Sequence, residues 1–168
     1  MPYSYGEYKY EFQEHMIKNF PNDITILDVG VGCGNYSVLL KENFNKLDGV
    51  EIFPKYDEMF NLKIKYRNLF IGDIFDYPHG HYDYVILGDI VEHMTIDSAQ
   101  KLLENIHQNG QHMMVSVPYC MKQGAEYGNE HEVHIQDDLT HELMLERYPY
   151  LTLLWKDEGY GYYINYEY

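Results

Sequence analysis

The sequence predicts an α/β domain built on a mostly parallel sheet with helices on both faces. Three observations predict it. Short apolar runs rich in β-branched residues alternate with segments of helical spacing. The first of these runs ends in glycines at alternate positions, and two runs near the C-terminus flank the turn-forming segment "DEGYG", as in an antiparallel hairpin. With 168 residues and 45% hydrophobic content, the chain is long enough for one domain over residues 1–168.

The expected strands are short and mostly apolar. The run at 24–30, "ITILDVG", is β-branched and ends in glycine, the run at 68–75 is weaker, and the run at 82–91 is strongly apolar. Five strands are expected before the hairpin, at 24–30, 47–53, 68–75, 82–91 and 111–119. The hairpin itself is expected at 151–156 and 162–168.

The expected helices follow the strands and carry recognisable ends. Thr95 is a plausible N-cap and Gly110 a stop for one of them, and Val38, Leu39 and Phe44 can share the face of another. The expected helices are 8–19, 35–44, 54–62, 95–109 and 137–149, the last opened by an Asp or Thr cap. Residues 1–22 are expected to form an N-terminal lid and helix.

The formal net charge of −15, from 12 basic and 27 acidic residues, argues against nucleic acid and anionic membranes as partners. The chain shows no apolar run long enough to span a bilayer and no secretory signal. Cys33 and Cys120 are the only cysteines, too few for a disulfide framework, so we expect a reduced, cytoplasmic protein.

The segment "ILDVGVGCGNYS" (26–37) limits which nucleotide can lie above the first strand. A phosphate-binding P-loop would need a lysine after the last glycine, and the dinucleotide pattern would need glycine where the chain has Asn35. What remains is D-x-G-x-G-x-G, which resembles motif I of the class I S-adenosylmethionine (SAM) dependent methyltransferases. The resemblance implies a Rossmann-like three-layer sandwich with a seven-stranded sheet. It also implies SAM as cofactor and S-adenosylhomocysteine (SAH) as product.

The same resemblance implies a set of cofactor-binding residues. Asp28 would lie beside the methionine ammonium, Glu51 would take both ribose hydroxyls, and Asp73 and Ile74 would hold the adenine. Each has a simpler alternative when taken alone, because Glu51 could be a surface acid and Asp73 a turn residue or helix cap. The complete expected set is Asp28, Gly30, Gly32, Gly34, Glu51, Asp73, Ile74 and Asp89.

Methyl transfer to a hydroxyl needs a base, and histidines follow the fourth and fifth expected strands. His134 is the first candidate, His93 the second and His131 the third, with the loop 119–138 bordering the acceptor pocket. The alternative is an acidic lid with ordinary histidines, or a His93 that only fixes its own loop. The segment "EHEVH" is not the H-E-x-x-H zinc pattern, so no metal is expected.

We therefore expect a methyltransferase that acts on a hydroxyl of a small-molecule or glycan acceptor. Two other functions remain open: methylation of a protein or peptide, and a SAM-binding partner subunit without catalysis. A chain of this length has little room for acceptor recognition, so the acceptor is small, or a partner or a homodimer mate completes the site. The tyrosines of "YSYGEYKY" (3–10) are expected to help close the cofactor pocket.

Overall fold

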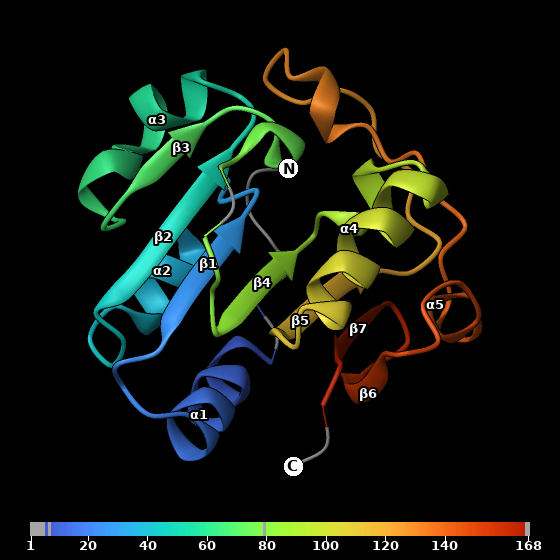
Figure 1. Ribbon diagram of the computed structural model, residues 1–168. Coiled ribbons are helices and arrows are strands. Elements are labelled where there is room, and N and C mark those ends of the chain that lie inside the picture. Colours follow the sequence, from blue (N-terminus) through green and yellow to red (C-terminus); the bar gives the residue numbers. More distant parts are fainter. Residues whose placement is uncertain (1–5, 7, 79, 167–168) are drawn as a thin grey trace. The chain divides into compact units, whose positions relative to one another are not determined.

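The computed structural model describes residues 6, 8–78 and 80–166, and Figure 1 labels its helices and strands. Seven strands form one mixed sheet in the order β3-β2-β1-β4-β5-β7-β6. Strand β2 runs parallel to both β1 and β3, whereas β7 runs antiparallel to both β5 and β6. The expected α/β, Rossmann-like fold with a C-terminal antiparallel hairpin is confirmed.

The elements alternate along the chain as the sequence pattern predicts. The strands are β1 (Thr25–Val29), β2 (Lys46–Glu51), β3 (Leu69–Ile71), β4 (Tyr84–Gly88), β5 (His112–Pro118), β6 (Thr152–Lys156) and β7 (Tyr160–Ile164). The α-helices are α1 (Lys9–Asn19), α2 (Asn35–Leu40), α3 (Lys55–Phe60), α4 (Ile96–Gln108) and α5 (His141–Arg147). Short 3-10 turns are η1 (Leu62–Ile64), η2 (Ile74–Asp76), η3 (Val91–His93) and η4 (Glu130–Glu132).

The chain divides into two compact units between Tyr84 and Val85. In the first unit α1 packs against α2, where the buried rings of Phe12 and Tyr36 meet edge to face with centroids 5.9 Å apart. The interior residues of β1 and β2 are almost all buried, as expected for central strands of a parallel sheet. This packing fixes the segment that follows β1.

In the second unit, α4 packs on β5, and β7 pairs with β5 from Met114 to Pro118. The hydroxyl of Thr95 caps α4 by accepting from the Ser98 amide, as the sequence predicts. Thr140 rather than an aspartate caps α5, and its hydroxyl accepts from the Leu143 amide. The loop 119–138 thus runs between two firmly held elements, β5 and the start of α5.

Several expected boundaries were wrong. The strand expected at 68–75 is confined to Leu69–Ile71, the helix expected at 137–149 to His141–Arg147, and the strand expected at 162–168 lies at Tyr160–Ile164. The helix expected at 35–44 ends at Leu40, because its buried face consists of Tyr36, Ser37 and Leu40, while Val38 is 59% exposed. The strand expected at 82–91 ends at Gly88, and the residues that follow form the turn η3. This last difference matters for the site, since it places Glu92 and His93 on a tight turn at the carboxyl end of β4.

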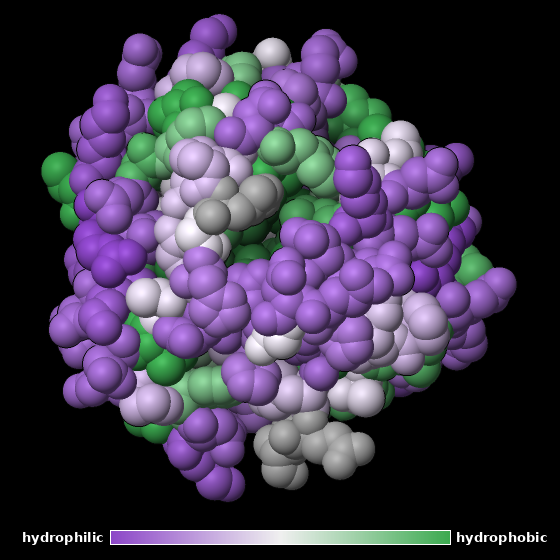
Figure 2. Space-filling model, viewed as in Figure 1, coloured by the Kyte–Doolittle hydropathy of each residue, from purple (hydrophilic) through white to green (hydrophobic). Residues whose placement is uncertain are grey.

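Hydrophilic side chains dominate the face shown in Figure 2, in keeping with a mean hydropathy of −0.48. Within the described part of the chain, no helix combines the length and hydrophobicity needed to cross a membrane. Tyr3 and Tyr5, two of the four tyrosines in the segment 3–10 to which we assigned the closing of the cofactor pocket, lie outside the described residues.

Candidate functional site

The glycine segment after β1 has the backbone that its composition predicts. Gly30, Gly32 and Gly34 all have positive φ, at 68°, 52° and 81°. Residues with a side chain adopt this region at a cost, whereas glycine adopts it freely, so three glycines let the loop turn tightly without strain. The Gly30 amide also donates to the Val50 carbonyl at 2.8 Å, which fixes the loop over the end of β2.

Glu51 ends β2 and holds the glycine loop directly. One of its carboxylate oxygens accepts from the Gly32 amide at 3.0 Å, and the other accepts from the Phe53 amide at 2.8 Å. The side chain is only 3% exposed. The carboxylate and the loop therefore form one rigid arrangement, in which displacing Glu51 would also release Gly32.

Asp28, near the end of β1, is a fully buried carboxyl group. The hydroxyl of Tyr66 donates to it at 2.6 Å. Burial raises the pKa of Asp28 to about 7, while the hydrogen bond from Tyr66 and the positive charge of Lys9 act in the opposite direction. Lys9 itself is buried, with its ammonium 5.1 Å from the Tyr36 ring centroid. A cation placed beside Asp28 would favour the ionised carboxylate.

The other expected cofactor residues have local roles in this structure. Asp73 caps η2 by accepting from the Phe75 amide at 2.9 Å, and Ile74 is buried at 8% exposure. Asp89, in the second unit, has a positive φ of 55° and accepts a short hydrogen bond from the Tyr160 hydroxyl. The second carboxylate oxygen of Asp73 accepts no hydrogen bond from the described residues.

The structure brings together two of the three histidines that the sequence nominates. The rings of His93 and His134 lie edge to face, with centroids 4.8 Å apart. His93 Nδ1 lies 3.2 Å from the Val133 carbonyl, and His134 Nδ1 lies 2.8 Å from the Met121 carbonyl. A carbonyl can only accept, so each Nδ1 carries the proton and each neutral ring keeps its lone pair on Nε2.

Burial keeps both rings neutral near pH 7. It lowers the pKa of His93 to about 4, with the neighbouring His134 acting in the same direction. It also lowers the pKa of His134. A neutral imidazole with a vacant Nε2 can accept a proton or bind a cation.

Glu92 completes this group, and its burial could not be read from the sequence. Its side chain is 1% exposed, and among the described residues neither carboxylate oxygen has a hydrogen-bond partner. Burial raises the pKa of Glu92 well above its usual range, and the charge of Asp89 adds to this. One ligand atom from each of Glu92, His93 and His134 lies within 4.8 Å of the other two.

Backbone pairing between distant segments builds the cluster. The Glu92 carbonyl accepts from the amides of Ile135 and Gln136, at 2.7 and 2.9 Å. The buried Gln136 side chain then donates to the carbonyls of Val91 and Met94, at 2.8 and 3.1 Å. This pairing fixes η3 against the segment after η4, so that His134 faces His93.

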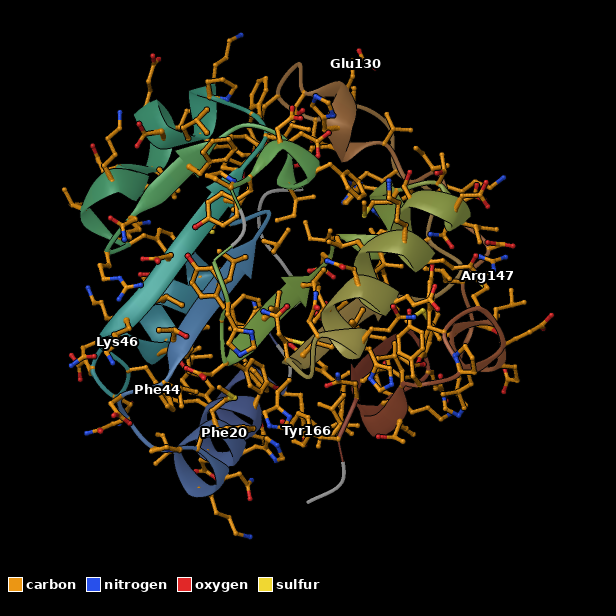
Figure 3. All side chains as sticks on the ribbon, in the orientation of Figure 1. Phe20, Phe44, Lys46, Glu130, Arg147 and Tyr166 are labelled. Carbon is orange, nitrogen blue, oxygen red and sulfur yellow. The ribbon has the colours of Figure 1, made fainter. Side chains whose placement is uncertain are left out.

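His131, the third candidate, is exposed on η4 and is not part of the Glu92–His93–His134 cluster. Its neighbour Glu130 is also exposed, at the outer end of the same turn (Figure 3). The "EHEVH" segment therefore does not converge as a unit, since only His134 belongs to the cluster. The sequence signal for the Glu92–His93–His134 cluster was instead the pair "EH" (Glu92 and His93) directly after the fourth strand.

The family model described as "Methyltransferase domain" matches residues 6–153, most of the chain. This chain belongs to the methyltransferase-domain family. The match and the seven-stranded fold identify it as a SAM-dependent methyltransferase domain of class I. None of the curated proteins compared with this methyltransferase matches it.

Solved structures share the fold of this methyltransferase at low sequence identity. PigF, solved with SAH, has a TM-score of 0.63 and 16% identity, covering 93% of this chain and 54% of its own. The 1,6-didemethyltoxoflavin-N1-methyltransferase of Burkholderia thailandensis was solved with 1,6-didemethyltoxoflavin and SAH. It has a TM-score of 0.64 and 16% identity, and the match covers 94% of this chain and 76% of that protein. The sugar N-methyltransferase KedS8 from a Streptoalloteichus species has a TM-score of 0.52 and 20% identity, and the match covers 65% of this chain and 47% of that protein. The chain thus spans about half the length of two of these proteins.

Proposed function

We propose that this methyltransferase transfers the methyl group of SAM to a hydroxyl oxygen of a small-molecule or glycan acceptor. A neutral hydroxyl is a weak nucleophile, so its proton must be removed or its oxygen polarised during transfer. The single observation that supports this acceptor chemistry is the Glu92–His93–His134 cluster, which combines two neutral rings with a buried carboxyl group. A SAM-binding subunit without catalysis would have no use for such a costly group.

We also propose that the residues of the first unit hold the cofactor in the roles that the sequence suggests. Glu51 would accept the two ribose hydroxyls, Asp28 would lie by the methionine ammonium, and the three glycines would leave room beside the loop. Two features support this assignment: the loop is rigid because Glu51 bonds to it, and Asp28 is a buried acid that a cation would stabilise. The glycine segment has no lysine after its last glycine, as a phosphate-binding loop would, and SAM carries no phosphate.

Calorimetric titration with SAH tests the cofactor assignment. Losing a charge-assisted, two-point contact costs ~1.5 to 3 kcal/mol, so Glu51→Ala should weaken SAH binding about tenfold or more. Asp57→Asn is the matched control, because Asp57 is an acid of the same unit that pairs with Lys63 on the surface. A loss below about twofold in Glu51→Ala, or an equal loss in the control, would contradict the assignment.

Methyl-labelled SAM tests the acceptor class. The protein should transfer label to members of a panel of small hydroxylated compounds and glycans, and not to basic peptides or RNA. His134→Ala should lower turnover by ~100-fold with SAH affinity retained, because it removes a reacting ring but no cofactor residue. Label found only in peptide, or unchanged turnover in His134→Ala, would refute the proposed function.

A further inference from the structure

The Glu92 carboxyl group poses a problem that the proposed function does not solve. A carboxylate with 1% exposure and no hydrogen-bond partner among the described residues costs several kcal/mol to ionise. One ligand atom of each of His93 and His134 lies within 4.8 Å of a ligand atom of this carboxyl group. A cation bound at this point would give the Glu92 carboxylate a partner, which the described residues do not supply.

The two histidines are oriented to help supply that charge. Each imidazole has its Nδ1 held by a backbone carbonyl, so Nε2 is the nitrogen left for a ligand. This is the usual support for a histidine that binds a metal, since the second bond fixes the tautomer and the ring orientation. A hydrogen-bonded base, in contrast, needs only one such ring, and here two lie edge to face.

From this geometry we propose that Glu92, His93 and His134 bind a divalent first-row transition-metal ion. Ligand atoms ~2.1 Å from one ion lie about 3.0 to 4.2 Å from each other. The three side chains start within 4.8 Å, so small side-chain rotations would close the site. Two imidazoles and one carboxylate favour zinc, manganese, cobalt or iron over magnesium and calcium, which prefer all-oxygen sites.

The scaffold around the ligands is rigid enough to hold an ion. The Glu92 carbonyl is fixed by two amides, and Gln136 links η3 to α5 through Arg147, whose guanidinium donates to its Oε1 at 3.0 Å. Three protein ligands leave further coordination positions open on the ion. His93 and His134 are both partly exposed, so an ion and a small oxygen ligand can reach them.

The binding of the metal ion does not depend on the proposed function, but its role in methyl transfer does. An ion with open positions would polarise an acceptor hydroxyl and lower the pKa of its proton, so that the proton can pass to water and no histidine base is needed. The oxygen–methyl bond would form as the sulfur–methyl bond of SAM breaks, which leaves SAH. His93 and His134 would then act as ligands, which accounts for two neutral rings at one point. The presence of the ion can be measured without any acceptor.

The test is direct metal titration of tag-free protein stripped with a chelator. Zn²⁺, Mn²⁺ and Co²⁺ are titrated separately by calorimetry, and bound metal is counted by elemental analysis after desalting. We expect one ion per chain and, with Co²⁺, visible absorption bands of a site with nitrogen and oxygen ligands. His134→Ala and His93→Ala should each weaken binding at least 100-fold, whereas His131→Ala, from the same loop, should bind as the wild type does.

Glu92→Gln separates loss of the ion from loss of the fold. The amide has nearly the same shape and removes a buried ionisable group, so the metal-free variant should be at least as stable as the wild type. The ion should raise the melting temperature of the wild type and not that of the variant. Equal binding by Glu92→Gln, or equal losses in His131→Ala and His134→Ala, would show adventitious binding and overturn the proposal. SAH titration of the same samples is expected to be unchanged, which separates this outcome from failure of the cofactor assignment.

Discussion

Replacing Asp28 with asparagine should stabilise the cofactor-free protein, and the gain should grow as the pH rises. The pKa of Asp28 is about 7 in the folded chain against 3.8 in its ordinary state, chiefly because of burial. Below about pH 3.8 Asp28 is protonated in both the folded and the unfolded chain, and the free energy of unfolding is not reduced by it. As the pH rises from 3.8 toward 7, Asp28 ionises in the unfolded chain but stays protonated in the folded one, so the folded state is progressively destabilised relative to the unfolded state.

The size of the effect follows from the separation of the two pKa values. Each pH unit within the window changes the free energy of unfolding by ~1.4 kcal/mol, so the full cost of Asp28 above pH 7 is about 4 kcal/mol. Less than half of this cost is already present at pH 5. The stability of Asp28→Asn relative to wild type should therefore increase by about 2 to 3 kcal/mol between pH 5 and pH 8. Asparagine keeps an oxygen for the Tyr66 hydroxyl, so little else changes.

Urea unfolding at pH 5, 6, 7 and 8, followed by tyrosine and tryptophan fluorescence, measures this difference. Asp83→Asn is the matched control. Hydrogen bonds from the Thr25 amide and hydroxyl lower the pKa of Asp83, so the stability that Asp83 contributes is lost only at acid pH. The free energy of unfolding of the control should therefore differ from that of the wild type by a constant amount between pH 5 and pH 8. A difference between Asp28→Asn and wild type that stays constant from pH 5 to pH 8 would refute the reasoning.

Three further predictions follow from the first unit and α5. SAH binding near pH 6 should release a proton, because the ammonium group of SAH favours the ionised form of Asp28. Calorimetry in buffers of different ionisation enthalpy measures the release, and a binding enthalpy that is the same in all buffers would count against a contact between the ammonium and Asp28. Gly34→Ala should destabilise the protein by about 1 to 2 kcal/mol in urea, because its φ is 81° and the added Cβ would lie 2.8 Å from Lys65 Cδ. Thr140→Ala should cost ~1 kcal/mol by removing the cap on the Leu143 amide, and an unchanged unfolding midpoint would show that α5 does not depend on it.

Most of the fold could be predicted because its signals are local. Alternation of short apolar runs with helical spacing located every strand, and the Thr95 cap located the start of α4. The errors occurred where packing decided the outcome. Val38 has the spacing of a core residue, but α2 rotates to bury Tyr36 and Ser37, and only the packed structure shows this.

The candidate site divides in the same way. A glycine pattern constrains its own backbone, so the positive φ values of the loop could be expected from the sequence alone. The histidine pair could not, because His93 and His134 are 41 positions apart and meet only through the pairing of Glu92 with Ile135 and Gln136. The sequence showed that both residues follow strand ends, but not that a buried glutamate lies beside them.

The distribution of charge links the two proposals. The chain carries a formal charge of −15, and Glu92, Asp89 and Glu132 concentrate acidic groups around two neutral histidines. Such a field attracts cations and repels anions, so a divalent ion gains twice what a monovalent one gains, and a phosphate-rich acceptor is disfavoured. Both proposed ligands, SAM with its sulfonium and ammonium groups and a divalent metal, fit this field. An uncharged hydroxylated acceptor neither gains nor loses by it, so its affinity should change little with ionic strength, whereas metal affinity should fall as salt is added.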